Sequence, residues 1–192
     1  TITRYMQWGG ELPPSLVVGV GYENETEAYE EDYRLFDLTP ADPNYVNYDG
    51  YISPDKVGGG DAFRKFLVDV LLPLIYEEYD VDQDNSVLFG HSLGGLFALN
   101  TMLEEPDSFK NILALSPSIW FADRSLLTRL EEDLENSFHF SGGLAVFVGE
   151  KEERIAGESF KMTSNVSDLG KLVANYQSSF GPVTVKVLQN ES

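Results

Sequence analysis

The sequence predicts an α/β fold in which helices cover both faces of a mostly parallel sheet. Short apolar segments of strand length alternate with amphipathic segments of helix length along the chain. This alternation is typical of β-α-β units, whose strands run parallel. The chain has 192 residues, of which 42% are apolar, and this length and composition suit one domain with one core. We therefore expect residues 1–192 to belong to a single domain.

Five segments have the pattern expected of strands. Each is a run of apolar residues bounded by turn-forming or polar residues, as in strands that are buried on both faces. These segments are residues 16–20, 86–89, 112–115, 144–148 and 183–188.

Four segments are predicted to be helical. In residues 61–75, apolar side chains recur every three or four positions and Asp61 occupies the position of an N-cap. Pro73 should kink or restart this helix because its ring displaces a backbone hydrogen bond. The other predicted helices are residues 95–103, 126–134 and about 166–176. Residues 37–60 are rich in Pro, Asn, Asp and Gly, and they predict a long irregular connection of the kind that is often functional.

The composition excludes several classes of function. Thirteen basic residues against 32 acidic ones give a net charge of −19 at pH 7, so we expect no nucleic-acid partner and no anionic membrane surface as partner. The chain has no cysteine, which excludes a disulfide framework, a thiolate zinc site and a cysteine nucleophile. No apolar run approaches the ~20 residues of a spanning helix, so a soluble protein is expected. The compartment stays open, with the cytoplasm favoured over the periplasm, and so does the oligomeric state.

The segment Gly90-His91-Ser92-Leu93-Gly94 matches the motif G-x-S-x-G. A predicted strand precedes it and a helical segment follows it, which is the context in which this motif presents a nucleophilic serine. Such a sharp reversal strains the backbone of its central residue, and we expect both glycines to relieve crowding there. Ser92 is therefore the predicted nucleophile, and the N–H of Leu93 is a predicted oxyanion donor. The alternative is a glycine-rich turn with an ordinary surface serine.

A nucleophilic serine needs a carboxylate that orients its general base. The acid is expected after a later strand, and residues 144–148 lead directly into Gly149-Glu150-Lys151-Glu152-Glu153. We prefer Glu152 over Glu150 and Glu153 as the catalytic acid. The alternative is that all three belong to an acidic surface loop.

The sequence offers no suitable general base, because the chain has only two histidines and neither is at the expected position. His91 lies beside the serine, where its side chain should diverge from that of Ser92. His139 precedes the predicted acid, whereas the order along the chain in this fold is serine, acid, histidine. We interpret His139 as a surface or packing residue, and we expect the catalytic histidine to lie beyond Ser192.

Several segments together resemble the putative-esterase family of α/β-hydrolases. They are PPSLVVGV, YRLFDLTP, VGGGDAFRKFLVDVLLPLI, LFGHSLGGLFAL, LSPSIWF and VGEKEE. The family includes ferric-enterobactin-type siderophore esterases and S-formylglutathione hydrolase, and the likeness is greater to its siderophore-esterase-like branch. The resemblance implies an α/β-hydrolase fold and hydrolysis of a small-molecule ester through an acyl-enzyme on Ser92, with no metal or cofactor.

The resemblance also implies what residues 1–192 would lack. Family members begin with further strands, which supply the second oxyanion donor, and Thr1 enters their pattern after that region. A histidine follows the segment that is similar to VLQNES. We therefore expect residues 1–192 to be a single but partial α/β-hydrolase domain.

Three further residues are candidates for substrate binding. Trp120, together with Phe121, resembles aromatics that the family places near the pocket, although both could be ordinary core residues. Arg34 could hold an anionic group of the substrate, but an internal ion pair with Asp37 is favoured. His91 is expected to line the sharp turn that presents Ser92. The alternatives to a serine ester hydrolase are a non-catalytic binding protein of the same fold and an acyltransferase on the same scaffold.

Overall fold

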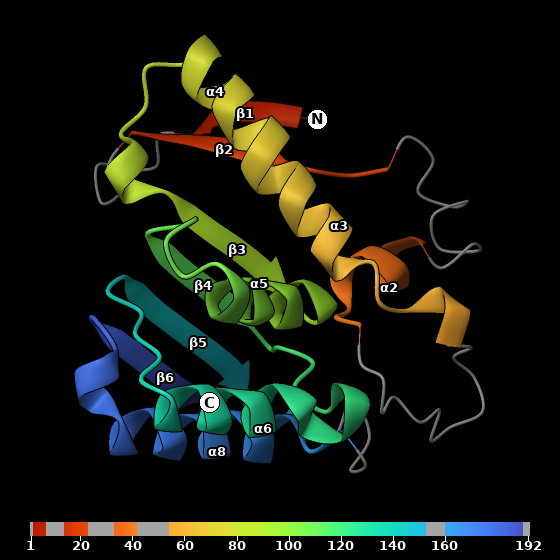
Figure 1. Ribbon diagram of the computed structural model, residues 1–192, viewed down its shortest axis with the longest axis vertical. Coiled ribbons are helices and arrows are strands. Elements are labelled where there is room, and N and C mark those ends of the chain that lie inside the picture. Colours follow the sequence, from red (N-terminus) through yellow and green to blue (C-terminus); the bar gives the residue numbers. More distant parts are fainter. Residues whose placement is uncertain (1, 7–13, 23–32, 42–53, 153–159, 190–192) are drawn as a thin grey trace.

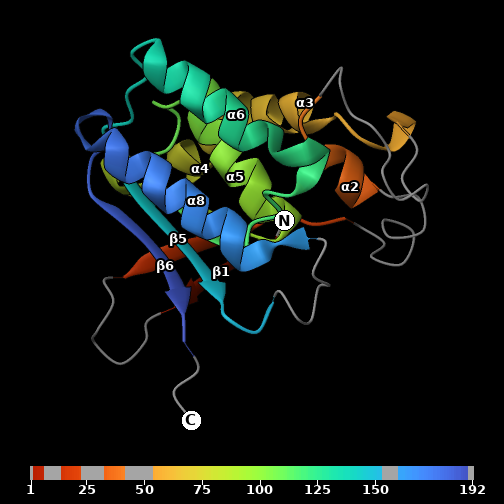
Figure 2. The same ribbon diagram turned by 90° about the horizontal axis from the view of Figure 1, so that it is seen from below.

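A computed structural model describes the chain apart from residues 1, 7–13, 23–32, 42–53, 153–159 and 190–192. Its main sheet has four parallel strands in the order β3-β4-β5-β6, and a two-stranded antiparallel sheet, β1-β2, precedes it (Figure 1). The strands are β1 (Ile2–Met6), β2 (Ser15–Gly19), β3 (Val87–His91), β4 (Asn111–Leu115), β5 (Gly143–Gly149) and β6 (Val183–Leu188). The predicted mostly parallel α/β fold is confirmed, but in the described residues α5 (Leu93–Glu104), α6 (Phe121–Glu135) and α8 (Met162–Asn175) cover one face of the parallel sheet (Figure 2), where helices on both faces were predicted.

The helices connect the parallel strands as predicted. The α-helices are α2 (Tyr33–Leu38), α3 (Gly60–Lys65), α4 (Leu72–Glu78), α5 (Leu93–Glu104), α6 (Phe121–Glu135) and α8 (Met162–Asn175). Shorter turns of helix are η1 (Pro54–Lys56), η2 (Phe66–Leu71, a π-helix), η3 (Gln83–Asn85) and η5 (Gln177–Ser179). In the described part of the chain, no helix is long and apolar enough to cross a bilayer.

The core lies under one face of the main sheet. Along β4 and β5, buried residues alternate with half-buried ones, and helices α5, α6 and α8 lie on the side of the buried set (Figure 2). Leu96, Ile112, Leu144 and Val146 are among the residues that fill this layer, each at most 2% exposed. The opposite face, which includes Phe89, is half-buried to exposed in the described residues.

The predicted helix over residues 61–75 consists of three segments. Regular helix α3 passes into the π-helical turn η2, and α4 begins at Leu72 with Pro73 in its first turn. Pro73 removes one backbone hydrogen bond from this continuous helical run, and the π-helical turn lies directly before it, where α4 begins. The predicted restart at Pro73 is thus seen as this change of helix type. The prediction that Asp61 caps the helix is wrong. Gly59 is the N-cap residue, and the Asp61 carboxylate accepts a hydrogen bond from the buried Arg64 at 3.1 Å instead.

Two elements were not predicted, and one strand is paired differently than expected. Strand β1 and helix α2 lie in segments without a clear period in the sequence. The first predicted strand forms as β2, but it pairs with β1 rather than with the parallel sheet. Of the predicted irregular connection, Asp37 and Leu38 belong to α2, while residues 42–53 lie outside the described residues.

The turn between β3 and α5 depends on Gly90 but not on Gly94. A Cβ at Gly90 would lie 2.0 Å from the carbonyl oxygen of Gly94, whereas a Cβ at Gly94 would meet no atom within 4 Å. The next residue, Gly95, also lies close to neighbouring backbone, with its Cβ position 3.0 Å from the Cα of Pro117. The expectation that both motif glycines relieve crowding therefore holds only for the first.

We predict that Gly90→Ala destabilises the protein by about 3 kcal/mol or more, because the added methyl group would collide with backbone that cannot move aside. Gly94→Ala is the matched control and should change the free energy of unfolding by less than about 1 kcal/mol. Urea unfolding of the two variants measures the difference. Equal losses would contradict the assignment of the crowded position.

Candidate active site

Ser92 lies in a sharp turn between the end of β3 and the start of α5. Its φ and ψ angles are 58° and −118°, a combination that is strained for a residue with a side chain. Its backbone N–H donates to the Leu115 carbonyl at 3.0 Å, and its carbonyl accepts from Leu96 at 3.0 Å and from Ser118 at 3.1 Å. The side chain is only half-buried. The predicted strained turn with an accessible serine is thus present at the carboxyl edge of the sheet.

The first turn of α5 directs free N–H groups toward this position. The hydrogen bond from Leu96 to the Ser92 carbonyl is the first of the helix, so the N–H groups of Leu93, Gly94 and Gly95 precede it and have no helical acceptor. Negative charge that develops near Ser92 would be stabilised by these donors and by the helix dipole. Leu93, the predicted oxyanion donor, is the first of them.

The turn after β4 places a second hydroxyl beside the first. Ser118 is 1% exposed, and its Oγ lies 3.2 Å from the Oγ of Ser92. Sequence reasoning did not identify this residue, although it lies within the LSPSIWF segment. The two hydroxyls can share a hydrogen bond in which either acts as donor, which limits the rotamers of Ser92.

Glu152 is directed toward the same turn from the end of β5. Its Oε1 accepts a hydrogen bond from the Ser116 hydroxyl at 2.5 Å and from the Gly149 N–H at 3.2 Å. Glu150 is exposed, and Glu153 lies outside the described residues. Two donors therefore fix the carboxylate of the preferred acid in orientation, and the Ser116-Pro117-Ser118 turn connects it to Ser92.

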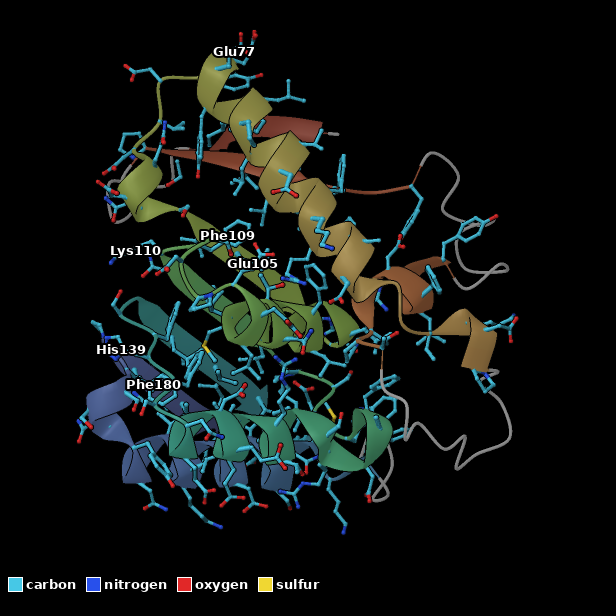
Figure 3. The ribbon with its side chains drawn as sticks, in the orientation of Figure 1. Glu77, Glu105, Phe109, Lys110, His139 and Phe180 are labelled. Atoms are coloured by element: carbon cyan, nitrogen blue, oxygen red, sulfur yellow. The ribbon has the colours of Figure 1, made fainter. Side chains whose placement is uncertain are left out.

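Neither histidine is placed where its ring could take the proton of the Ser92 hydroxyl. His91 is exposed and, by alternation along β3, lies on the face opposite to the one that α5 covers. His139 is exposed and lies beside Phe180, where β5 and β6 begin (Figure 3). Ser92 follows the carboxyl end of β3, so His139 is at the opposite edge of the sheet. This agrees with its interpretation as a surface residue.

The predicted substrate-binding residues lie in different surroundings. Trp120 is half-buried and its ring contacts that of Phe160 edge to face, with 4.6 Å between centroids. Phe121 is a core residue at 1% exposure. Arg34 lines a large cavity beside β3. The carboxylate of its suggested partner, Asp37, accepts a hydrogen bond from the Tyr22 hydroxyl at 2.8 Å.

Burial and the contact with Asp37 raise the pKa of the Tyr22 hydroxyl above its usual range. Tyr22 is therefore a neutral donor at physiological pH. Among the residues that the structure describes, no group of three or more His, Asp and Glu side chains could hold a metal ion. The acidic segment 23–32 lies outside them.

A strained serine between a parallel strand and a helix, with a glutamate after a later strand, defines an α/β-hydrolase type of site. Residues 9–177 match the model of the family described as "Putative esterase". The chain belongs to this esterase family, as its sequence motifs indicated.

The similar proteins include enzymes that act on siderophores. A siderophore enterobactin esterase of Emericella nidulans is 34% identical over 147 residues, which are 72% of this chain and 48% of the relative. The ferri-bacillibactin esterase BesA of Bacillus subtilis is 37% identical over 126 residues, or 62% of this chain and 43% of the relative. The chain thus spans less than half the length of these two relatives.

Solved structures show the same fold. The siderophore hydrolase EstA from Aspergillus nidulans superposes with a TM-score of 0.74 at 27% identity, covering 83% of this chain and 60% of that one. The BES protein from Bacillus cereus superposes with a TM-score of 0.67 at 28% identity, covering 93% and 65%.

We predict that Glu152→Ala lowers the free energy of unfolding by about 1–3 kcal/mol, because it leaves the Ser116 hydroxyl, which is 6% exposed, without its acceptor. Glu150→Ala, at an exposed position two residues earlier, should change it by less than about 0.5 kcal/mol. Chemical unfolding of both variants tests the contact. Equal effects would show that Glu152 is held no more firmly than its exposed neighbour.

Proposed function

We propose that this chain supplies the nucleophile, one oxyanion donor and the acid of a serine ester hydrolase. The observation that carries the proposal is the strained, half-buried Ser92 at the start of α5, with free helical N–H groups beside it. Ser92 is the nucleophile, the N–H of Leu93 stabilises the oxyanion, and Glu152 orients the general base. Residues 1–192 form a part of one α/β-hydrolase domain.

The reaction proceeds by acyl transfer through Ser92. Its Oγ attacks the ester carbonyl carbon while the base takes the hydroxyl proton, and the negative charge forms on the carbonyl oxygen near Leu93 N–H. The C–O bond to the alcohol then breaks, and the alcohol leaves with the proton from the base. Water adds to the acyl-enzyme in the same way, releases the acid and restores the serine.

The base of this mechanism is a histidine that follows Ser192. Neither His91 nor His139 occupies a suitable position, and the end of β6 adjoins the segment that carries Glu152, because the Glu150 N–H donates to the Leu188 carbonyl at 3.0 Å. This contact supports a histidine after β6 as the partner of the Glu152 carboxylate. This position also agrees with the order serine, acid, histidine of the fold.

The substrate class that we propose is an ester of a siderophore. The support is that the similar proteins are named siderophore esterases and a siderophore hydrolase. The net charge of −19 disfavours strongly anionic substrates through repulsion at long range, so a site for an anionic ester would need a local cation. Arg34 is the cation that the sequence offers for this role, and the cavity that it lines does not include Ser92 or Glu152.

A fluorophosphonate probe should label Ser92 in the product of the complete reading frame, and peptide mass spectrometry would locate the adduct. Ser92→Ala should abolish labelling and reduce hydrolysis of p-nitrophenyl esters by at least about 10³-fold, since the acyl-enzyme can no longer form. Ser167→Ala, an exposed serine on α8, is the control and should leave both unchanged. Retained hydrolysis in Ser92→Ala would exclude Ser92 as nucleophile.

Glu152→Gln should lower kcat by about 10²-fold or more in the same protein, because the amide no longer stabilises the charged base. Glu150→Gln is the matched control and should leave kcat within about twofold of the parent. Steady-state kinetics with a p-nitrophenyl ester gives both values. A larger loss in Glu150→Gln would move the catalytic acid to that residue.

A further inference from the structure

Ser92 and Ser118 are joined by two hydrogen bonds. The Ser118 N–H donates to the Ser92 carbonyl at 3.1 Å, and the Oγ atoms of the two side chains lie 3.2 Å apart. Because one of the two bonds is formed by backbone groups, the contact between the hydroxyls does not depend on side-chain orientation alone.

The turn that carries Ser118 packs closely on the first turn of α5. A Cβ at Gly95 would lie only 3.0 Å from the Cα of Pro117, so the backbones of the two turns are in close contact. The residue that follows Ser118, Ile119, is fully buried in the core. The position of Ser118 beside Ser92 is therefore fixed by packing on both sides of it.

The Ser118 hydroxyl is buried, whereas that of Ser92 is accessible. Ser118 is 1% exposed, and Ser92 is half-buried. Among the residues that the structure describes, the hydrogen-bond partner of the Ser118 hydroxyl is Ser92 Oγ. A buried hydroxyl that loses its partner costs free energy, so the contact should persist while Ser92 reacts.

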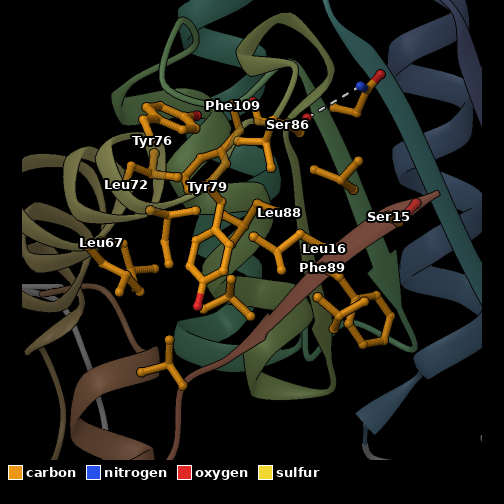
Figure 4. A pocket seen from close by; sticks show the side chains of 18 of the residues that line it. Ser15, Leu16, Leu67, Leu72, Tyr76, Tyr79, Ser86, Leu88, Phe89 and Phe109 are labelled. Carbon is orange, nitrogen blue, oxygen red and sulfur yellow. Dashed lines mark hydrogen bonds between the residues drawn. The ribbon is translucent and has the colours of Figure 1, made fainter. Parts of the chain in front are cut away.

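The large cavity beside β3 does not include this pair of hydroxyls. Leu16 of β2 and Phe89 of β3 are among the residues that line it (Figure 4). Neither Ser92 nor Ser118 is among its described lining residues. The Ser118 hydroxyl is thus not a binding group of that cavity, and the contact that gives it a role is the one with Ser92.

The transfer of protons during the reaction determines the direction of the hydrogen bond. Each hydroxyl has one proton to donate, and either can be the donor before the reaction. When Ser92 attacks an ester, its proton goes to the general base, so none is left for Ser118. The proton of Ser118 is then directed at Ser92 Oγ.

We propose that Ser118 is a catalytic residue that donates a hydrogen bond to Ser92 Oγ during acyl transfer. This role rests on the proposed function, because it requires Ser92 to be the nucleophile. As the base takes the Ser92 proton, partial negative charge collects on Oγ until the new C–O bond is formed, and the Ser118 hydroxyl stabilises that charge. When the acyl-enzyme breaks down, the electrons of the C–O bond return to Oγ, which regains its proton from the base. Ser118 keeps its own proton throughout.

Such a donor accelerates the reaction because its bond is stronger in the transition state than before the reaction. Before the reaction, the bond joins two neutral hydroxyls. In the transition state the acceptor carries partial negative charge, and charge-assisted hydrogen bonds are about twice as strong as neutral ones. Only a contact that strengthens in this way raises the rate of the chemical step.

Ser118→Ala tests this role in the product of the complete reading frame. The rate constant for labelling of Ser92 by a fluorophosphonate should fall by about 10- to 100-fold, the effect of losing a hydrogen bond to a charged group. For a p-nitrophenyl ester, kcat should fall by a similar factor while KM stays within about threefold, because the donor acts in both acylation and deacylation. Ser108→Ala, at a half-buried serine that donates to the Glu105 carbonyl at 2.8 Å, is the control and should change neither.

Ser118→Cys separates hydrogen bonding from packing. Cysteine fills the space of the serine, but its S–H is a weak donor, so this variant should be slowed nearly as much as Ser118→Ala. Full activity in Ser118→Cys would show that the residue only fills space and would overturn the proposal. Rates for Ser118→Ala within about twofold of the parent would do the same. If Ser118→Ala does not fold, Ser118→Cys decides by the same criterion.

The role of Ser118 and the proposed function can fail separately. A parent protein in which the fluorophosphonate does not label Ser92 would exclude the proposed function and, with it, the role of Ser118. If the parent and Ser118→Ala are labelled at Ser92 at the same rate, the serine hydrolase remains and the role of Ser118 is excluded.

Discussion

The site depends on the register of three parallel strands. Ser92 follows β3, the Ser116-Pro117-Ser118 turn follows β4, and Glu152 follows β5. The register aligns His91 with Leu115 and Leu115 with Phe147, so the three ends lie side by side at the same edge. Backbone hydrogen bonds continue across it, from Ser92 to Leu115 and from Ser116 to Phe147. A shift of one strand by a residue would separate the side chain that it carries from its partner on the neighbouring strand.

Two residues at this edge have backbone conformations that cost energy. The φ angle is 58° at Ser92 and 45° at Ser116, and neither is a glycine. Strain of this kind persists only where the surrounding structure fixes it. Here the elements that flank the two turns contribute fully buried residues to the core, among them Ala98, Ala114 and Ile119, each 0% exposed. The core under the sheet thus maintains the conformation that presents the Ser92 hydroxyl and orients the Ser116 hydroxyl toward Glu152.

The sharp turn at Ser92 was predictable from the sequence, because the contacts that shape it are formed between residues close together in the chain. The close approach of Gly90 to Gly94, the strand before it and the helix after it all lie within a few residues, so a short motif encodes them. Ser118 was not predictable in this way. Its hydroxyl meets that of Ser92 only because β3 pairs with β4. A single sequence does not show which turns come together when strands pair. Asp61 was misread for a similar reason, since its partner Arg64 also binds Glu105, the residue that follows α5.

The residues before β3 are much less buried than those from α5 onward, and Ser92 lies between these two parts of the chain. From α5 onward, the helices bury a continuous apolar layer, whereas before β3 the only buried apolar side chain among the described residues is Leu67. Strand β3 belongs to the well-packed half through β4 and α5, yet its other edge faces the cavity. The packing of β4 to β6 can therefore fix the turn at Ser92 even though Val87 and Phe89, on the same strand, are 53% and 57% exposed.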